Sequence, residues 1–274
     1  MPGTLFIIGT PIGNLEDISF RAVRVLREAG RIACEDTRHT RRLLDHYGID
    51  KPLLSYHEHN EKERAAELLR ELEEGVTVAL VSDAGTPLIA DPGYRIVSAA
   101  RERGIPVSPI PGPSAVMTAL SASGLATDAF LFAGFLPPKP GARRRMIEAW
   151  QSLEATLVFY EAPHRIVESL RVMAEVVGQR RVVLARELTK MHEEFLDGTA
   201  SSIADTLEAR PSIKGEFTIL VARAAATPVS SPADIEAEVA ALVAAGAPRM
   251  DALKTVARRH GVSKREVYRR VEGG

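Results

Sequence analysis

The segment LVSDAGTPLIADPG, residues 80–93, decides the fold because it joins a buried strand to a long rigid loop. The apolar residues Val78 to Val81 predict a strand in the core of a sheet. Glycines and prolines then hold the chain open, and Asp83 and Asp91 place two carboxylates in this loop. We therefore expect an acidic, stiff loop at the carboxyl end of a buried strand.

Strand-like and helical stretches alternate along the first part of the chain. Strands are expected at residues 4–8, 31–35, 52–57, 76–82 and 106–110. Helices are expected at residues 19–30, 40–48, 60–75 and 94–104, with Ser19 and Asn60 as candidate caps. This order predicts parallel strands joined by right-handed crossovers, with ligand sites at the carboxyl ends of the strands.

The second half of the chain predicts another α/β lobe, with a mixed sheet. Its strands are expected at residues 130–135, 156–160, 181–187, 193–197 and 216–223, with a hairpin around 181–197. Its helices are expected at residues 141–152, 163–177 and 201–209. A small-residue linker at 224–233 precedes three short helical patterns. The predicted domains are an N-terminal lobe (1–113), a C-terminal lobe (114–226) and a linker with a basic helical module (227–274).

Composition limits the classes of protein to consider. The 274 residues carry a formal net charge of −1, so any nucleic-acid binding must come from local basic patches. Cys34 is the single cysteine, so neither an intrachain disulfide nor a cysteine metal cluster can form. The sequence shows no signal peptide and no apolar run of membrane-spanning length, and we expect a soluble cytoplasmic protein. The seven histidines show no ligand pattern, so no metal is expected.

Three loops at predicted strand ends are candidate ligand sites. The first, GTPIGNLED (9–17), lacks both the G-x-G-x-x-G and the P-loop patterns, which disfavours a phosphate cradle. In the second loop, Asp91 before Pro92 is expected to cap a helix, whereas Asp83 is expected to contact a ligand. In the third, Ser114 is expected to cap the following helix and to contact a ligand beside the other loops.

Seven motifs follow one another along residues 9–190: GTPIGNLEDIS, ACEDTR, SDAGTPLIADPG, PGPSA, FLP followed by basic residues, FYEAPHR and ARELTK. Together they resemble the tetrapyrrole-methylase fold family and, within it, the ribosomal RNA small-subunit methyltransferase I group. The resemblance implies two α/β lobes of the tetrapyrrole-methylase type, with S-adenosylmethionine in the cleft between them, in a homodimer. It also implies 2′-O-methylation of a cytidine ribose in 16S ribosomal RNA.

Carried onto this sequence, the resemblance places the methyl donor on the loop after the 76–82 strand. Asp83 would lie near its polar groups, and Leu88 and Ile89 would lie against it. The residues assigned to the cofactor are Pro11, Asp83, Leu88, Ile89, Ser114, Ala115 and Tyr160. Tetrapyrrole enzymes of this family usually carry a shorter Gly-Asp-Pro turn here, so the longer loop argues against a porphyrin or corrin substrate.

Methylation of a ribose hydroxyl needs help in removing its proton, because the hydroxyl is a weak nucleophile. The candidates are Glu161, Lys190 and the neighbours Glu35 and Asp36. Our hypothesis takes Glu161 as the base and Lys190 as the cation that lowers the pKa of the hydroxyl, with Asp36 as a third catalytic candidate. In the alternative, Glu161 pairs with Arg165 one helical turn later and only braces the loop.

RNA contacts should be cationic, and two basic runs follow predicted strand ends on the ligand side. The candidates in the two lobes are Arg21, Arg38, Arg41, Arg42, Lys139, Arg143, Arg144 and Arg145, and those in the tail are Arg258, Arg259, Lys264 and Arg265. A solvated charged surface is the alternative for each run.

The tail MDALKTVARRHGVSKREVYRRV (250–271) predicts two helices around a turn that contains Gly261, with the second helix starting at Ser263. Its expected inner face, packed on a helix at 234–245, is formed by Leu253, Val256, Ala257, Val262 and Val267. From Arg249 to Arg270 there are eight Lys or Arg residues against two acidic ones, which favours an RNA contact over a docking or dimerisation module.

Two other functions stay open at this point. A tetrapyrrole methyltransferase would have the same fold and act on a different substrate. A non-catalytic RNA-binding assembly factor would bind RNA on its surface and have a vestigial cofactor cleft. A nucleotide hydrolase is disfavoured because the phosphate-binding motif is missing.

Overall fold

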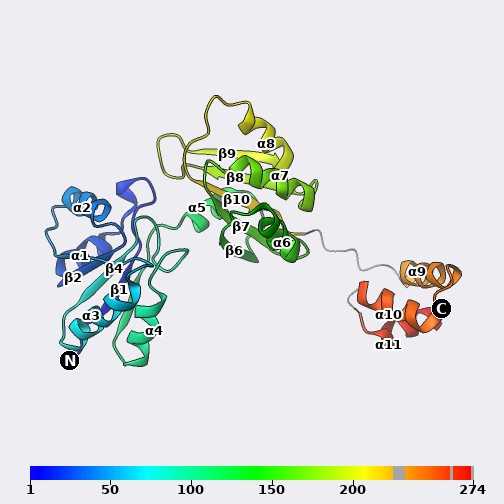
Figure 1. The fold of residues 1–274 in the computed structure, drawn as a ribbon, viewed down its shortest axis with the longest axis horizontal. Coiled ribbons are helices and arrows are strands. Elements are labelled where there is room, and N and C mark those ends of the chain that lie inside the picture. The colour runs from blue at the N-terminus through cyan, green and yellow to red at the C-terminus, as the bar shows by residue number, and fades with distance from the viewer. Residues whose placement is uncertain (225–231, 260–261, 273–274) are drawn as a thin grey trace. The chain divides into compact units, whose positions relative to one another are not determined.

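The computed structural model describes residues 1–224, 232–259 and 262–272 (Figure 1). The chain forms two compact units, Met1–Arg223 and Ala224–Gly274. Residues 225–231 of the predicted linker lie outside the described residues, as does the predicted turn glycine Gly261, and the last two linker residues, 232 and 233, begin helix α9 (Pro232–Ala244) instead. In the described ranges, no helix combines the length and the apolar character needed to cross a bilayer.

The first lobe is built on a parallel sheet with the strand order β3-β2-β4-β1-β5. The strands are β1 (Leu5–Ile8), β2 (Arg31–Cys34), β3 (Leu53–Ser55), β4 (Val78–Val81) and β5 (Val107–Ile110). The helices are the 3-10 turn η1 (Leu15–Asp17), α1 (Phe20–Glu28), α2 (Thr37–His46), α3 (Glu61–Glu73), α4 (Tyr94–Glu102) and α5 (Ala115–Ala122). The predicted alternation of parallel strands and helices is confirmed.

Both faces of this sheet are buried, which explains why its strands are apolar without alternation. On one face, Ile8, Ile32 and Val81 pack with α1 and α2. On the other face, Leu5 and Leu80 pack with α3 and α4. Because helices cover both faces, ligands can reach the sheet only at the strand ends.

Helices α1 and α2 begin directly after a residue whose side chain caps them. The Ser19 hydroxyl accepts a hydrogen bond from Ala22 N (3.1 Å), as predicted for α1. Helix α2 begins at Thr37, three residues earlier than predicted, because Asp36 caps it by accepting from Arg38 N (2.8 Å). Asn60 stands at the N-cap position of α3 but makes no capping hydrogen bond with its side chain.

The second lobe contains the predicted mixed sheet, in the order β6-β7-β10-β8-β9. Its strands are β6 (Phe130–Phe135), β7 (Thr156–Glu161), β8 (Arg181–Arg186), β9 (Glu194–Thr199) and β10 (Phe217–Val221). Strands β6 and β7 are parallel, the other pairs are antiparallel, and β8 and β9 form the predicted hairpin. The helices α6 (Pro140–Trp150), α7 (Ile166–Val177) and α8 (Ala200–Glu208) cover one face.

Helix α5 connects the two lobes. Its residues Val116, Ala119 and Leu120 pack on the face of the second sheet that α6–α8 leave open, against Val158 and Leu220. Helix α5 follows β5, the last strand of the first sheet, after a short loop (Figure 1). The carboxyl edge of the first sheet therefore lies next to β7 and β10.

The second unit holds α9 (Pro232–Ala244), α10 (Arg249–Arg259) and α11 (Lys264–Glu272) around its own small core. The predicted inner face is confirmed: Leu253, Val256, Ala257 and Val267 are buried, and Val262 packs against them. The Ser263 hydroxyl accepts from Glu266 N (3.2 Å), so Ser263 caps α11, which then begins at Lys264.

Candidate functional site

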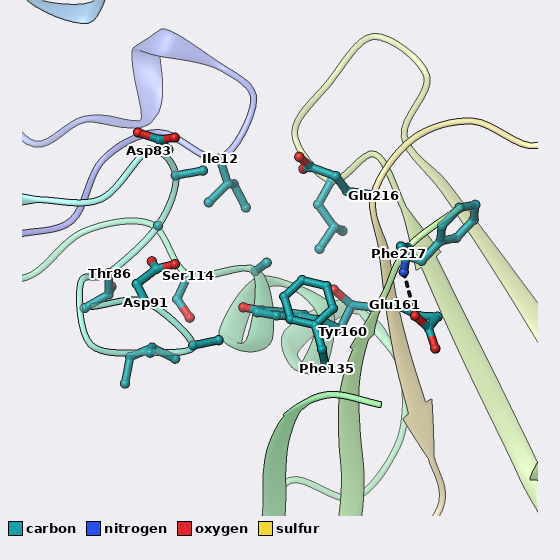
Figure 2. Close-up of a pocket in the computed structure, with 18 of the residues that line it drawn as sticks. Ile12, Asp83, Thr86, Asp91, Ser114, Phe135, Tyr160, Glu161, Glu216 and Phe217 are labelled. Carbon is teal, nitrogen blue, oxygen red and sulfur yellow. Dashed lines mark hydrogen bonds between the residues drawn. The ribbon is translucent and has the colours of Figure 1, made fainter. Parts of the chain in front are cut away.

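Three loops at the carboxyl ends of β1, β4 and β5 are locked together. Thr10 and Gly85 exchange two backbone hydrogen bonds (2.9 and 3.0 Å), and the Thr10 hydroxyl donates to the Ser82 carbonyl (3.0 Å). The Thr86 hydroxyl donates to the Pro113 carbonyl (3.1 Å), which ties the second loop to the third. These bonds fix the wall of a cavity of about 350 Å³ that reaches across to the second lobe (Figure 2).

The loop after β4 holds an unfavourable backbone conformation. Leu88 (φ 74°) and Ala90 (φ 68°) both lie in the left-handed region, where residues with a Cβ are rare. The Leu88 side chain packs into the core beside Leu80, whereas Ile89 is 44% exposed and lines the cavity. Such strain persists only where the surroundings enforce it, and it is frequent at binding sites. Leu88 anchors the loop from beneath and is not among the residues that line the cavity, so its contact with the cofactor stays a prediction without support from the cavity wall.

Asp91 does not cap a helix, contrary to the sequence prediction. Helix α4 begins at Tyr94, and its N-cap is Gly93, whose φ of 138° suits glycine. Asp91 instead lines the cavity, where Figure 2 shows it close to Ser114. Burial raises the pKa of Asp91, and the neighbouring charge of Asp83 raises it further. The cavity therefore contains a carboxylate that gains from a cationic ligand.

Ser114 stands at the N-cap position of α5, but its side chain makes no capping hydrogen bond. Ser114 and Ala115 line the cavity instead, at the point where the first N–H groups of α5 lack helical partners. The capping role predicted for Ser114 is therefore wrong. Its hydroxyl stays available to a ligand.

The second lobe supplies an aromatic wall. The Tyr160 ring makes edge contacts with Phe132 and Phe135, at centroid distances of 4.8 and 5.5 Å. Burial, with a smaller effect from Asp91, raises the pKa of Tyr160 to about 12, so its hydroxyl stays protonated at neutral pH. Phe217 and Thr218 also line the cavity, because β10 runs antiparallel to β7 and begins beside the end of β7.

Glu161 is bound into the fold. Its side chain is fully buried and pairs with Arg165 (Oε1 to Nη2, 2.7 Å). Ala162 N donates to the same oxygen (2.8 Å), and the Ser169 hydroxyl donates to Oε2. Figure 2 shows Glu161 on the far side of Tyr160 from Asp91. Glu161 also lines the cavity, but both of its carboxylate oxygens are engaged by these partners. The bracing alternative matches these contacts, and the role of Glu161 as the base stays a prediction.

Lys190 stands beside the cavity rather than in its wall. Its Nζ pairs with Glu187 (2.8 Å) and Glu216 (3.0 Å), and of these three residues only Glu216 lines the cavity. The turn that carries Lys190 contacts the first loop: a Cβ added to Gly13 would lie 2.9 Å from Thr189 Oγ1. Glycine at position 13 thus lets the β1 loop close against the second lobe.

Asp36 acts on its neighbour Asp83. Its own carboxylate caps α2 and pairs with Arg38 (2.8 Å), and the hydrogen bonds from Arg38 hold the pKa of Asp36 well below its usual range. Its backbone N–H donates to Asp83 Oδ1 (2.9 Å) and so orients that carboxylate. Glu35 lies close by, and its pKa is raised by burial and by Asp83. Asp36 therefore contacts Asp83 through its backbone, while its own carboxylate is engaged by α2 and Arg38.

A second hollow of about 240 Å³ shares one lining residue, Asp83, with this cavity. Pro11 lines this second hollow and Ile12 lines the first, so the Pro11 prediction is shifted by one residue. Among the described residues, no cluster of three or more His, Cys, Asp or Glu side chains could hold a metal ion.

The basic candidates divide into paired and unpaired groups. Arg143 is fully buried: its guanidinium donates to the Pro137 and Pro138 carbonyls (both 3.2 Å) and pairs with Glu168, so it cannot contact RNA, and that prediction is wrong. Arg144 pairs with Glu175, Arg38 with Asp36 and Arg41 with Asp50. The exposed candidates that form no ion pair with another described residue are Arg21, Arg42, Lys139 and Arg145. In the tail, Arg265 is exposed and Lys264 half-buried, whereas the side chains of Arg258 and Arg259 lie outside the described part.

Several cavity residues were not singled out from the sequence. They are Ile12, Thr86, Phe135, Pro163, Leu188, Glu216, Phe217 and Thr218. Five of them, Ile12, Thr86, Phe135, Pro163 and Leu188, stand inside the quoted motifs, so the sequence carried a signal for them. Glu216, Phe217 and Thr218 lie at the start of the antiparallel strand β10. The rule that ligands bind at the carboxyl ends of parallel strands does not predict a site there.

The family pattern of the Tetrapyrrole (Corrin/Porphyrin) Methylases matches residues 4–204. A relative from Mesorhizobium japonicum, named ribosomal RNA small subunit methyltransferase I, is 48% identical over 97% of this chain and 90% of its own. A relative of the same name from Halalkalibacterium halodurans is 46% identical over 97% of this chain and 93% of its own.

Among solved structures, the fold is similar to that of uroporphyrin-III C-methyltransferase from Thermus thermophilus in complex with S-adenosylhomocysteine. The TM-score is 0.55, the sequence identity is 20%, and the match covers 80% of this chain and 97% of that one. At this identity the likeness concerns the fold alone.

Proposed function

Since the chain belongs to the tetrapyrrole methylase family, alongside the ribosomal RNA small subunit methyltransferase I proteins, we propose that it methylates 16S ribosomal RNA with S-adenosylmethionine as donor. The target is the 2′-hydroxyl of a cytidine ribose. The relatives' name and their near full-length identity support the RNA substrate.

The observation that carries this proposal is the cavity between the three locked loops and the aromatic wall. Its apolar and aromatic residues, Ile12, Ile89, Phe135 and Tyr160, suit an adenosyl group. The carboxylate of Asp91, whose pKa is raised by burial, suits the positive charges of the donor. The first N–H groups of α5 and the free Ser114 hydroxyl suit its polar edges.

When bound, S-adenosylmethionine supplies a methyl group whose bond to sulfur breaks, with the electron pair kept by sulfur, as the acceptor oxygen binds the carbon. The residues of this chain must align the acceptor and remove its proton. Asp83 fits this task because it lines both hollows and its Oδ2 accepts no hydrogen bond from another described residue. The N–H of Asp36 holds the other oxygen.

Glu161, Lys190 and Asp36 have structural partners, as described above. Lys190 keeps a supporting role: paired with Glu216, it joins the β8–β9 turn to the start of β10 at the cavity rim. The proton acceptor that we propose is therefore Asp83, with Asp36 as its positioning residue.

Unpaired cations on the first lobe and on α6 favour RNA over a porphyrin or corrin substrate. Arg21, Arg42, Lys139 and Arg145 are exposed and have no acidic partner among the described residues. The homodimer and the cytoplasmic location, which the resemblance implies, belong to this proposal as well. So does the RNA contact of the basic tail.

The proposal is tested with labelled donor and small ribosomal subunits, followed by mapping of the modified nucleotide. Asp83→Ala should weaken donor binding by about 1–3 kcal/mol, measured by calorimetry, because it removes hydrogen bonds to a partly buried ligand. Asp83→Asn keeps size and polarity, so donor binding should persist while single-turnover methylation slows about 100-fold.

Asp45→Asn is the matched control. Asp45 is exposed on α2, outside both hollows, so neither binding nor rate should change. If Asp83→Asn turns over at the wild-type rate, the proton leaves by another route. If no methyl group reaches the subunits while the donor binds, the substrate assignment is wrong.

A further inference from the structure

The second hollow is separate from the cavity proposed for the donor and shares only Asp83 with it among the described residues. It has about 240 Å³, and its wall comes only from the first lobe: the start of the β1 loop, helix α2 and the end of β4. Of the residues that line the donor cavity, Asp83 alone also lines this hollow, among the described residues. The two hollows thus meet at one carboxylate.

An in-line methyl transfer requires the acceptor oxygen on the opposite side of the methyl group from sulfur. The binding site of the acceptor must therefore adjoin the donor cavity without overlapping it. We propose that the second hollow receives the target nucleotide of the RNA, with its ribose toward Asp83. This inference rests on the function proposed above and adds where, and by which side chains, the acceptor is held.

The wall of the hollow has the chemistry of a nucleotide site. Pro11, Leu15 and Leu43 offer apolar surface for a base or a sugar face. Thr40 and Ser82 also line the hollow with buried hydroxyls, for which the structure gives no well-formed hydrogen bond. Their polar neighbours are the Cys34 thiol and the Asp91 carboxylate, respectively. Buried hydroxyls normally find partners, and a ribose or a base edge supplies both donors and acceptors.

The remaining wall residues suit the backbone of the nucleic acid. Arg42 and His39 follow each other on the exposed side of α2 and line the hollow. The Arg42 side chain forms no ion pair with another described residue, in contrast to Arg38 and Arg41 on the same helix. An unpaired guanidinium beside a nucleoside-sized hollow is placed to bind a phosphate.

The first experiment compares three variants of the full-length protein. Thr40→Val removes one hydroxyl at nearly constant volume, Arg42→Glu reverses the charge, and Arg101→Glu makes the same charge reversal on exposed α4, outside both hollows. Each is measured for the concentration of small ribosomal subunits that gives half-maximal methylation, for donor affinity by calorimetry and for unfolding temperature.

We expect the half-maximal subunit concentration to rise about fivefold for Thr40→Val, on the scale of one lost hydrogen bond. For Arg42→Glu we expect about a tenfold rise and a flatter salt dependence. Donor affinity and unfolding temperature should match the wild type, which a merely structural role of Thr40 does not predict. If both variants show the concentration dependence of Arg101→Glu, the inference is overturned.

A second measurement does not depend on turnover. A photoreactive benzoylphenylalanine replaces Leu15, which is 39% exposed in the wall of the hollow, and in the control it replaces Arg101. Irradiation with small ribosomal subunits should link position 15, and not position 101, to one short region of 16S RNA that contains the methylated nucleotide.

This measurement separates the two proposals. If the wild type transfers no methyl group, a unique cross-link from position 15 still supports the nucleotide site, and the proposed reaction alone fails. If methylation proceeds and position 15 gives no RNA cross-link, or the same scattered products as position 101, the second hollow does not hold the acceptor.

Discussion

Replacing Glu161 by glutamine separates a catalytic role from a structural one. The carboxylate is fully buried, pairs with Arg165 and accepts hydrogen bonds from Ala162 N and the Ser169 hydroxyl. Glutamine keeps the size but removes the charge, which leaves the Arg165 guanidinium, 19% exposed, without its counter-ion. Breaking a buried ion pair costs about 3–5 kcal/mol, and the partial exposure of Arg165 favours the lower end, about 3 kcal/mol.

The assay is urea unfolding followed by circular dichroism, together with single-turnover methylation at a temperature where the variant stays folded. We expect the free energy of unfolding to fall by about 3 kcal/mol and the rate of the folded variant to stay within about threefold of wild type, far from the loss of a catalytic base. The double variant Glu161→Gln with Arg165→Met should recover part of the stability, because no charge is then left unpaired. A Glu161→Gln protein that is as stable as wild type but about 100-fold slower would refute the bracing role.

Three other perturbations follow from the structure. Burial raises the pKa of Asp91 in the folded chain. The contribution of this group to stability is therefore complete below the ordinary pKa of about 3.9 and is lost as the pH rises through the folded pKa. The ligand-free Asp91→Asn variant should have a higher melting temperature than the wild type at neutral pH and the same melting temperature below about pH 4. Arg143→Met should lower the free energy of unfolding by about 2 kcal/mol, since it leaves two backbone carbonyls without their donor. The same change at the exposed Arg145 should weaken RNA binding and leave stability unchanged. Deleting residues 233–274 should keep donor binding, because that unit has its own core, and raise the subunit concentration for half-maximal rate; an unchanged value would exclude the tail as an RNA contact.

The first lobe was predictable because a parallel sheet obeys a positional rule. Once strands and helices alternate, side chains just after the strands must gather at one edge. Asp83, Ile89, Ser114 and Ala115 were chosen on that basis or by resemblance, and all four line the cavity. The helix starts were less certain, because Asp91-Pro92 and Ser114 have the composition of caps without the geometry.

The second lobe was less predictable, because its sheet is mixed. Strand β10 runs antiparallel to β7, so Phe217 faces Glu161 and Thr218 faces Tyr160 across the ladder. The start of one strand therefore meets the end of another, a neighbourhood set by pairing between distant segments. The residues around Glu216, Phe217 and Thr218 form no sequence motif from which their position in the cavity wall could be predicted.

The remaining differences between the predicted and the observed roles of charged residues arise from burial. Burial depends on the packing of the whole lobe and not on the neighbouring sequence. Arg143, Arg144 and Arg145 are identical side chains in sequence, but the helix turns the first inward beneath the Pro137–Pro138 turn and the others outward. Glu161 ends a buried strand and Asp83 follows another, yet only Glu161 has an arginine four residues later that neutralises it. Asp83 keeps one oxygen free of described partners, since the Asp36 N–H donates only to Oδ1 and Arg38 pairs with Asp36 instead. Asp83 is therefore a carboxylate with one free oxygen that lines both hollows, and this is why we propose it as the group that takes the proton of the acceptor hydroxyl.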